Sequence, residues 1–152
     1  INPATFLTSD QYLIRVSSLS DPAVKDSNDA VFSVIPPITN YYVNDGTYDA
    51  NLDRYTRAAG NDSNDGLTPF TPKASIRAIL ETYDLEFGDT IFVDNGTYLL
   101  GANIVIQNED SGVTIQGPNW SGGVALLNRG NTATTANVFE LNNAIAVTLS
   151  NL

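Results

Sequence analysis

Short apolar runs in the second half of the chain predict a mainly β fold whose strands wind into a solenoid, a parallel β-helix. The runs are three to five residues long, and clusters of Gly, Asn and Asp separate them at intervals of about 9 to 13 residues. No second helical segment interrupts them, which argues against a sheet of alternating strands and helices. Val113, Ile115, Val147 and Leu149 alternate with polar residues, as the filled interior of a coil requires.

The first forty residues predict a different element, a β-hairpin from a β-sandwich-like segment. Residues 11–18 and 30–36 both show period-two alternation, and a polar loop with a Pro turn lies between them. The pair Pro36-Pro37 then stiffens the chain. We therefore place a domain boundary here, with residues 1–37 as the end of the sandwich-like segment and its linker, and residues 38–152 as the capped start of the solenoid.

One α-helix is predicted ahead of the apolar runs. Thr71 is placed to cap it, and Pro72 suits its first turn. Its apolar positions follow the helical spacing i, i+3, i+4 and i+7, and they are Ile76, Ile79, Leu80 and Tyr83. Because the first coil of a solenoid has an exposed interior and unpaired strand edges, we expect this helix to cover that end.

Three motifs around the helix carry a family resemblance. They are G-N-D-x-N-D-G from Gly60 to Gly66, P-x-x-S-I from Pro72 to Ile76, and G-D-T-I-x-V-x-x-G-x-Y from Gly88 to Tyr98. On these motifs the chain from about residue 41 to residue 152 resembles the N-terminal capping region of the right-handed parallel β-helix, or pectate-lyase-like, superfamily. The resemblance implies a right-handed coil. It leaves the activity open, because the superfamily contains lyases, hydrolases, epimerases and non-enzymatic surface modules.

The first segment resembles the last strands of immunoglobulin-like or fibronectin-like modules in extracellular bacterial proteins. This second resemblance implies a large secreted or cell-surface protein, in which such modules neighbour β-helices. Met is absent even from position 1, so we expect the chain to start inside a longer precursor or after processing.

The composition excludes several classes of function. Seven Lys and Arg against seventeen Asp and Glu give a net charge of −10, which repels phosphate backbones and anionic membrane surfaces, so we expect no nucleic-acid partner. The sequence has no Cys and no His, which removes thiolate metal sites and the nucleophile pairs that depend on His. No apolar run is long enough to span a membrane.

The loop from Asn61 to Asp65 is a candidate Ca²⁺ site. Asp62, Asn64 and Asp65 offer oxygen ligands of the kind that hard cations prefer, although the loop lacks the spacing of an EF-hand. The alternative is that these side chains bond neighbouring backbone amides and build turns. No other cofactor is expected.

Three aromatic residues are candidate glycan contacts. Tyr48, Tyr55 and Trp120 lie in polar or Gly-rich loops, where rings can stack on sugar faces. The alternative is that the tyrosines belong to a solvated loop and that Trp120 packs against the flank of the solenoid.

With His and Cys absent, carboxylates are the side chains left for acid–base catalysis, and the candidates are Asp94, Asp110 and Glu140. Arg129 is the candidate base for a lyase reaction. Each is also explained by a turn, an outward position or a local ion pair, so we assign no catalytic residue. The sequence therefore favours a non-catalytic structural or adhesive module, which self-associates or contacts neighbouring domains and forms fibres or a surface layer through strand edges. Two alternatives stay open: the start of a polysaccharide lyase, hydrolase or epimerase with its catalytic coils outside this chain, and a carbohydrate-binding module.

Overall fold

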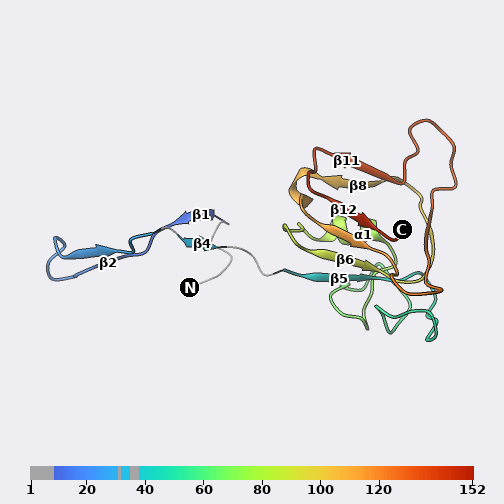
Figure 1. The fold of residues 1–152 in the computed structure, drawn as a ribbon, viewed down its shortest axis with the longest axis horizontal. Coiled ribbons are helices and arrows are strands. Elements are labelled where there is room, and N and C mark those ends of the chain that lie inside the picture. The colour runs from blue at the N-terminus through green and yellow to red at the C-terminus, as the bar shows by residue number, and fades with distance from the viewer. Residues whose placement is uncertain (1–8, 31, 35–37) are drawn as a thin grey trace. The chain divides into compact units, whose positions relative to one another are not determined.

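A computed structural model describes residues 9–30, 32–34 and 38–152, and the chain divides into two compact units, Ile1–Pro37 and Ile38–Leu152. Figure 1 labels α1 and those strands of each unit for which there is room. No helix within the described ranges is long and apolar enough to cross a membrane.

The first unit contains two antiparallel strand pairs. β1 (Ser9–Tyr12) pairs with β4 (Phe32–Val34), and β2 (Arg15–Ser17) pairs with β3 (Lys25–Ser27). The segment expected as one strand over residues 11–18 is thus divided between β1 and β2, and the expected polar loop contributes β3. Pro36 and Pro37, together with Val31 and Ile35 of the second predicted strand, lie outside the described residues. That this hairpin belongs to a β-sandwich stays a prediction.

The second unit is built from three sheets in which every strand pair is parallel. The largest sheet has the order β12-β9-β6-β5, and the other two pair β7 with β10 and β8 with β11. Figure 1 shows β5, β6 and β12 together in one sheet and β8 beside β11 in another. The strands are β5 (Asn40–Val43), β6 (Thr90–Val93), β7 (Gly96–Leu99), β8 (Ile104–Gln107), β9 (Thr114–Gln116), β10 (Ala125–Asn128), β11 (Phe139–Asn142) and β12 (Thr148–Ser150).

The chain passes through the three sheets in a repeating order. From β6 it continues to β7 and β8, then returns to the first sheet with β9, continues to β10 and β11, and returns once more with β12. A short 3-10 helix, η2 (Asn108–Asp110), lies between β8 and β9. The mainly β class with one short α-helix is therefore confirmed for the described residues, and the three sheets of the second unit are parallel.

The register of the parallel strands lines up the core side chains in columns. In the largest sheet Tyr41, Ile91, Ile115 and Leu149 stand at matching positions of successive strands. The first three are 5%, 0% and 0% exposed, whereas Leu149 in the last strand is 45% exposed. The predicted inward orientation of Val113 and Ile115 is confirmed, since both are fully buried.

The helix α1 (Ile76–Thr82) begins later than the sequence predicted. Its N-cap is Ser75, whose hydroxyl oxygen accepts a hydrogen bond from the Ala78 N–H at 3.1 Å, and the expected cap at Thr71 with Pro72 in the first turn is wrong. The helix starts late because of a long-range contact. Lys73 forms a parallel β-bridge with Val43 of β5, so Lys73 has an extended backbone and cannot belong to the helix.

The predicted burial of the helix is confirmed. Ile76 and Ile79 are 2% and 0% exposed, and Leu80 and Tyr83 pack against the core. Helix α1 lies against β6 and β8. The Tyr83 ring also contacts the Tyr41 ring, with 4.9 Å between the ring centroids. Helix α1 is therefore amphipathic and packs its apolar face on the core; that it caps the first turn of a solenoid stays a prediction.

The buried face of this helix predicts a test of the cover. Ile79→Ala should lower the free energy of unfolding by about 2–5 kcal/mol, because it leaves a cavity in a site with no exposed surface. Urea unfolding followed by the fluorescence of Trp120, which is the sole tryptophan, measures this for the second unit. Arg77→Ala on the exposed face of the same helix is the matched control, and its salt bridge to Glu81 should contribute less than about 1 kcal/mol. Equal losses in the two variants would contradict a buried cover.

Candidate functional site

The loop predicted as a cation site folds around a lysine. The Lys73 ammonium donates hydrogen bonds to the carbonyl oxygens of Asp62 at 2.9 Å and Asn64 at 2.7 Å. Lys73 is only 4% exposed, so its charge is enclosed by the loop. Backbone carbonyl oxygens are also the ligands that a hard cation would use. The ammonium therefore already neutralises the centre of this loop.

Two of the side chains predicted as metal ligands are bonded to the chain just before α1. The Asp62 carboxylate accepts hydrogen bonds from the Ala74 N–H at 2.9 Å and from the Ser75 hydroxyl at 3.2 Å. The Asn64 amide donates to the Pro72 carbonyl oxygen at 2.8 Å. Both contacts fasten the loop to the start of the helix.

The third predicted ligand, Asp65, makes similar bonds. Its carboxylate accepts hydrogen bonds from the Thr71 hydroxyl at 2.6 Å and from the Leu67 N–H at 3.1 Å, and these two bonds are the main reasons why its pKa is lowered. Its carbonyl oxygen accepts a hydrogen bond from the Tyr83 hydroxyl at 2.7 Å. Within the described ranges no group of three or more acidic side chains is arranged to hold a metal ion. Calcium binding stays a prediction.

Asp94, a candidate acid or base, is an anchor for the loop that follows β5. It is fully buried. One carboxylate oxygen accepts from the Arg54 N–H at 3.0 Å, and the other accepts from the N–H and the hydroxyl of Thr56 at 2.7 and 2.9 Å. A carboxylate that is enclosed and bonded in this way has no access to a substrate.

Asp53, which lies in the loop that follows β5, is a second buried carboxylate and is 4% exposed. One of its oxygens accepts hydrogen bonds from the Asn44 side-chain amide at 3.0 Å and from the Asp49 N–H at 2.8 Å. The pKa of Asp53 is raised above its ordinary value, mainly by desolvation and also by the nearby charges of Asp94 and Asp45, although the two hydrogen bonds act in the opposite direction. The loop thus carries one carboxylate that resists ionisation.

The remaining catalytic candidates also have local partners. Asp110 is buried, and its carboxylate accepts the Leu85 N–H at 3.2 Å. Arg129 and Glu140 meet at a shared partner: the Asn103 oxygen accepts from the Arg129 Nε at 3.2 Å, and the Asn103 amide donates to Glu140 at 3.1 Å. Asp110, Arg129 and Glu140 each form a hydrogen bond within the protein.

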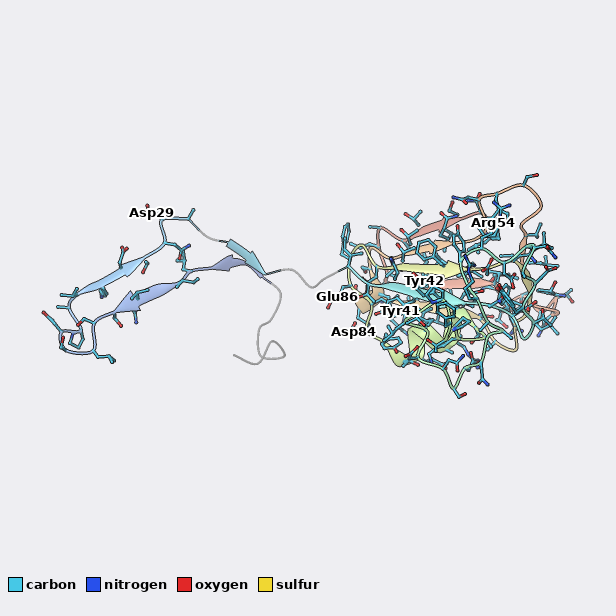
Figure 2. All side chains as sticks on the ribbon, turned by 90° about the horizontal axis from the view of Figure 1, so that it is seen from below. Asp29, Tyr41, Tyr42, Arg54, Asp84 and Glu86 are labelled. Atoms are coloured by element: carbon cyan, nitrogen blue, oxygen red, sulfur yellow. The ribbon has the colours of Figure 1, made fainter. Side chains whose placement is uncertain are left out.

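Two of the three predicted glycan contacts meet in an aromatic cluster on the outer face of the largest sheet. The Tyr55 ring lies edge-on to Trp120 at 4.8 Å and tilted against Phe92 at 4.7 Å, and Phe92 stacks on Tyr42 at 5.9 Å. The Arg54 guanidinium lies 5.4 Å from the Trp120 ring. Figure 2 labels Tyr42 and Arg54, which come from β5 and from the loop beyond it.

The aromatic rings of this cluster contact one another and the Arg54 guanidinium. Tyr55 also donates its hydroxyl hydrogen to the Gly117 carbonyl oxygen at 3.1 Å, and the buried indole N–H of Trp120 has no acceptor among the described residues. Tyr48, the third predicted contact, is 41% exposed and does not join the cluster. The arrangement fastens two loops to the sheet, and sugar binding by Tyr48, Tyr55 and Trp120 stays a prediction.

An uncovered apolar surface lies beside the last strand of each of the three parallel sheets. We call this surface, formed by Leu127, Phe139, Leu141, Leu149 and Leu152, the open end. By register Phe139 and Leu141 continue the columns of Ile104 and Ile106, which are 1% and 0% exposed, yet Leu141 is 54% exposed. A hollow of about 450 Å³ lies here, lined by Ala125, Leu126, Leu127, Val138, Phe139, Leu149, Asn151 and Leu152.

The two ends of the stack differ in their hydrogen bonding. At the first end, the outer edge of β5 is occupied, because Tyr42 N–H donates to the Gly66 carbonyl at 2.8 Å and Lys73 N–H donates to the Tyr42 carbonyl at 3.0 Å. At the open end, β10, β11 and β12 each pair with a single strand within the part of the chain that the structure describes. Their outer edges carry N–H and C=O groups that a further strand can bond.

Sequence reasoning expected free strand edges but missed the uncovered core positions at the open end, and it also missed the enclosed Lys73. The alternation in the last apolar run indicated that Leu149 points inward, but it gave no sign that the position is uncovered. Lys73 was missed because its partners are carbonyl oxygens, which every residue carries. The signal available for Lys73 was its position as the first basic residue after the acidic loop from Asn61 to Asp65.

Comparisons of the chain with protein-family models, with curated proteins and with solved structures found no match. The interpretation of the open end therefore rests on its geometry and chemistry.

The enclosed ammonium predicts how this loop responds to calcium. Wild-type protein should unfold at the same urea concentration with and without millimolar Ca²⁺, because Lys73 already fills the loop. Lys73→Met should lose about 1–3 kcal/mol of stability, since it leaves two carbonyl oxygens without their donor. Lys25→Met in the exposed hairpin is the control. Calcium-dependent stabilisation of the wild type would instead support Asp62, Asn64 and Asp65 as ligands.

The raised pKa of Asp53 predicts a pH dependence. Because its pKa is higher in the folded than in the unfolded protein, the folded protein takes up the proton first as the pH falls. This group therefore adds stability as the pH falls from above the folded pKa toward the ordinary value of 3.8. Asp53→Asn cannot titrate, so its unfolding free energy relative to wild type should decline across that window. A difference that is constant with pH would show that burial does not perturb this carboxyl.

Proposed function

We propose that residues 38–152 are the capped start of a right-handed parallel β-helix, and that the chain is a non-catalytic structural or adhesive module of a large secreted or cell-surface protein. The observation that carries this proposal is the open end, where core positions and strand edges are left for further strands. The repeating order of the three parallel sheets supports the winding, because a β-helix adds one strand to each sheet in every turn.

The two ends support a structural role in different ways. The helix and the segment from Gly66 to Lys73 close the first end, so growth from that side is blocked. The open end offers three parallel edges around an apolar interior, which is what another turn requires. A module with one closed and one growing end suits the base of a longer stack.

The carboxylates also support a role other than catalysis. Asp94 and Asp110 are buried and bonded to backbone amides, and Glu140 is bonded to Asn103. These bonds explain why acidic residues stand at these positions without any reaction. Extracellular localisation follows from the two family resemblances and is part of the proposal.

Adding one turn tests the proposal. A second copy of residues 118–151, inserted after Asn151, continues the register because Asn151 stands opposite Gly117 as Ser150 stands opposite Gln116. The added turn should cover Leu141 and Leu149 and raise the free energy of unfolding by a few kcal/mol. Amides of β10, β11 and β12 should also exchange hydrogen more slowly.

The control has the same length but carries Ser in place of the inward apolar residues of the inserted copy, at the positions equivalent to Leu127, Phe139 and Leu149. It should gain neither stability nor protection from exchange. If the unaltered insert also gains neither, the open end does not accept a further turn and the proposed function is wrong.

A further inference from the structure

We propose that the second unit binds an extended, basic segment of a partner protein, which adds as a strand to the outer edge of β8 in a groove beside α1. This inference goes beyond the proposed function and does not use the open end. The groove is formed by residues 77–110, from α1 to the 3-10 helix that follows β8.

The groove consists of two adjoining hollows of about 460 and 430 Å³, and we call it the α1–β8 groove. The hollows are continuous, because Leu80, Glu81 and Gln107 line both of them. The first hollow also contacts Arg77, Asn103 and Val105, and the second also contacts Asp84, Glu109 and Asp110. A continuous groove beside a strand is the shape that an extended peptide requires.

Two of the three strand edges at the first end are already occupied. The Tyr42 backbone of β5 bonds to Gly66 and Lys73, as described above. The Thr97 N–H of β7 donates to the Asp45 carboxylate at 3.1 Å. Strand β8 provides the third edge, and α1 packs against this strand.

The backbone of Val105 faces the α1–β8 groove without a partner. The Ile104 N–H donates to the Val138 carbonyl oxygen at 2.9 Å, so alternate residues of β8, Ile104 and Ile106, bond to β11. The N–H and C=O of Val105 therefore point away from β11. None of the residues that the structure describes bonds to either group. Val105 thus offers a donor and an acceptor to an added strand.

The charge of the groove determines which peptide fits it. Asp84 and Glu109 are exposed, and neither forms an ion pair within the described ranges. Their charges add to desolvation in raising the pKa of the buried Asp110. Arg77 is the basic residue of the lining, and its Nε already lies 3.4 Å from the Glu81 carboxylate. Lys or Arg side chains of a bound strand complement this negative potential.

Two capped hexapeptides test the proposal, one with three Lys-Val repeats and the other with three Glu-Val repeats. Calorimetry with the full chain should show that the Lys-Val peptide binds about tenfold more tightly or better, and that salt weakens it. The Val105 amide should exchange hydrogen more slowly in the complex, because the added strand accepts its hydrogen bond. Equal binding of the two peptides, or unchanged exchange at Val105, would overturn the inference.

A change at the strand edge tests the mode of binding. Val105→Pro removes the free N–H and keeps the bonds to β11, since Pro is tolerated on an edge whose N–H is unpaired. The affinity for the Lys-Val peptide should fall about tenfold. Val105→Thr keeps both the N–H and the branched shape, so it is the matched control and should bind as wild type does. Urea unfolding followed by Trp120 fluorescence checks the fold of both variants.

The same bond can be removed from the ligand, which keeps the test valid if Val105→Pro does not fold. A Lys-Val peptide that is N-methylated at alternate residues has the same charge but cannot pair along both edges, so its affinity should fall to a similar extent. Wild-type affinity for the methylated peptide would show that no strand is added, and the inference would be wrong.

Charge reversal in the groove tests the chemistry of the partner. Asp84→Lys and Glu109→Lys should each weaken the Lys-Val peptide by about fivefold. Asp29→Lys makes the same change of net charge on the first unit and should leave the affinity unchanged; Figure 2 labels both Asp84 and Asp29. A chitosan hexamer is the cationic probe without a peptide backbone. If it binds as tightly as the Lys-Val peptide, the groove recognises charge alone and the proposed strand addition is rejected.

Discussion

Each strand of the second unit depends on its parallel neighbours for its backbone hydrogen bonds and for the cover of its inward side chains. A strand of three or four residues has too little surface to be stable by itself, so burial accumulates only by stacking. The column from Tyr41 through Ile91 and Ile115 to Leu149 shows this dependence directly, because the exposed fraction rises only in β12. β5 also pairs with a single strand, but the segment from Gly66 to Lys73 bonds to its outer edge. The ends of such a stack therefore determine what the module can contact.

At the first end, two different segments cover the apolar core and the outer edge of β5. Helix α1 covers the apolar interior, and the segment from Gly66 to Lys73 occupies the backbone groups of β5. The acidic loop ahead of the helix holds these segments together. Its carboxylates accept backbone and hydroxyl hydrogens, and the enclosed Lys73 ammonium offsets the negative potential of its carbonyl oxygens. The loop is acidic because anions serve as acceptors there.

Much of this architecture could be predicted from the sequence, because it follows from local alternation. The six apolar runs that became β6 and β8 to β12 each alternate or are short and bounded by turn residues. β7 was missed because its sequence GTYL follows Asp94 and Asn95 in a cluster typical of a turn, and only its pairing with β10 identifies it as a strand. The late start of α1 and the place of Lys73 were missed for the same reason, since both depend on contacts with β5, thirty residues earlier.

The glycine motif illustrates how far a sequence pattern can inform on function. A Cβ atom on Gly60 would lie 1.8 Å from the Asn44 carbonyl oxygen, so no larger residue fits where this segment meets the end of β5. Gly66 has a φ of +72°, which favours glycine, and it supplies the carbonyl that bonds Tyr42. Both glycines thus serve the closure of the first strand. The motif accordingly informs on how the outer edge of β5 is closed, and it does not identify a partner.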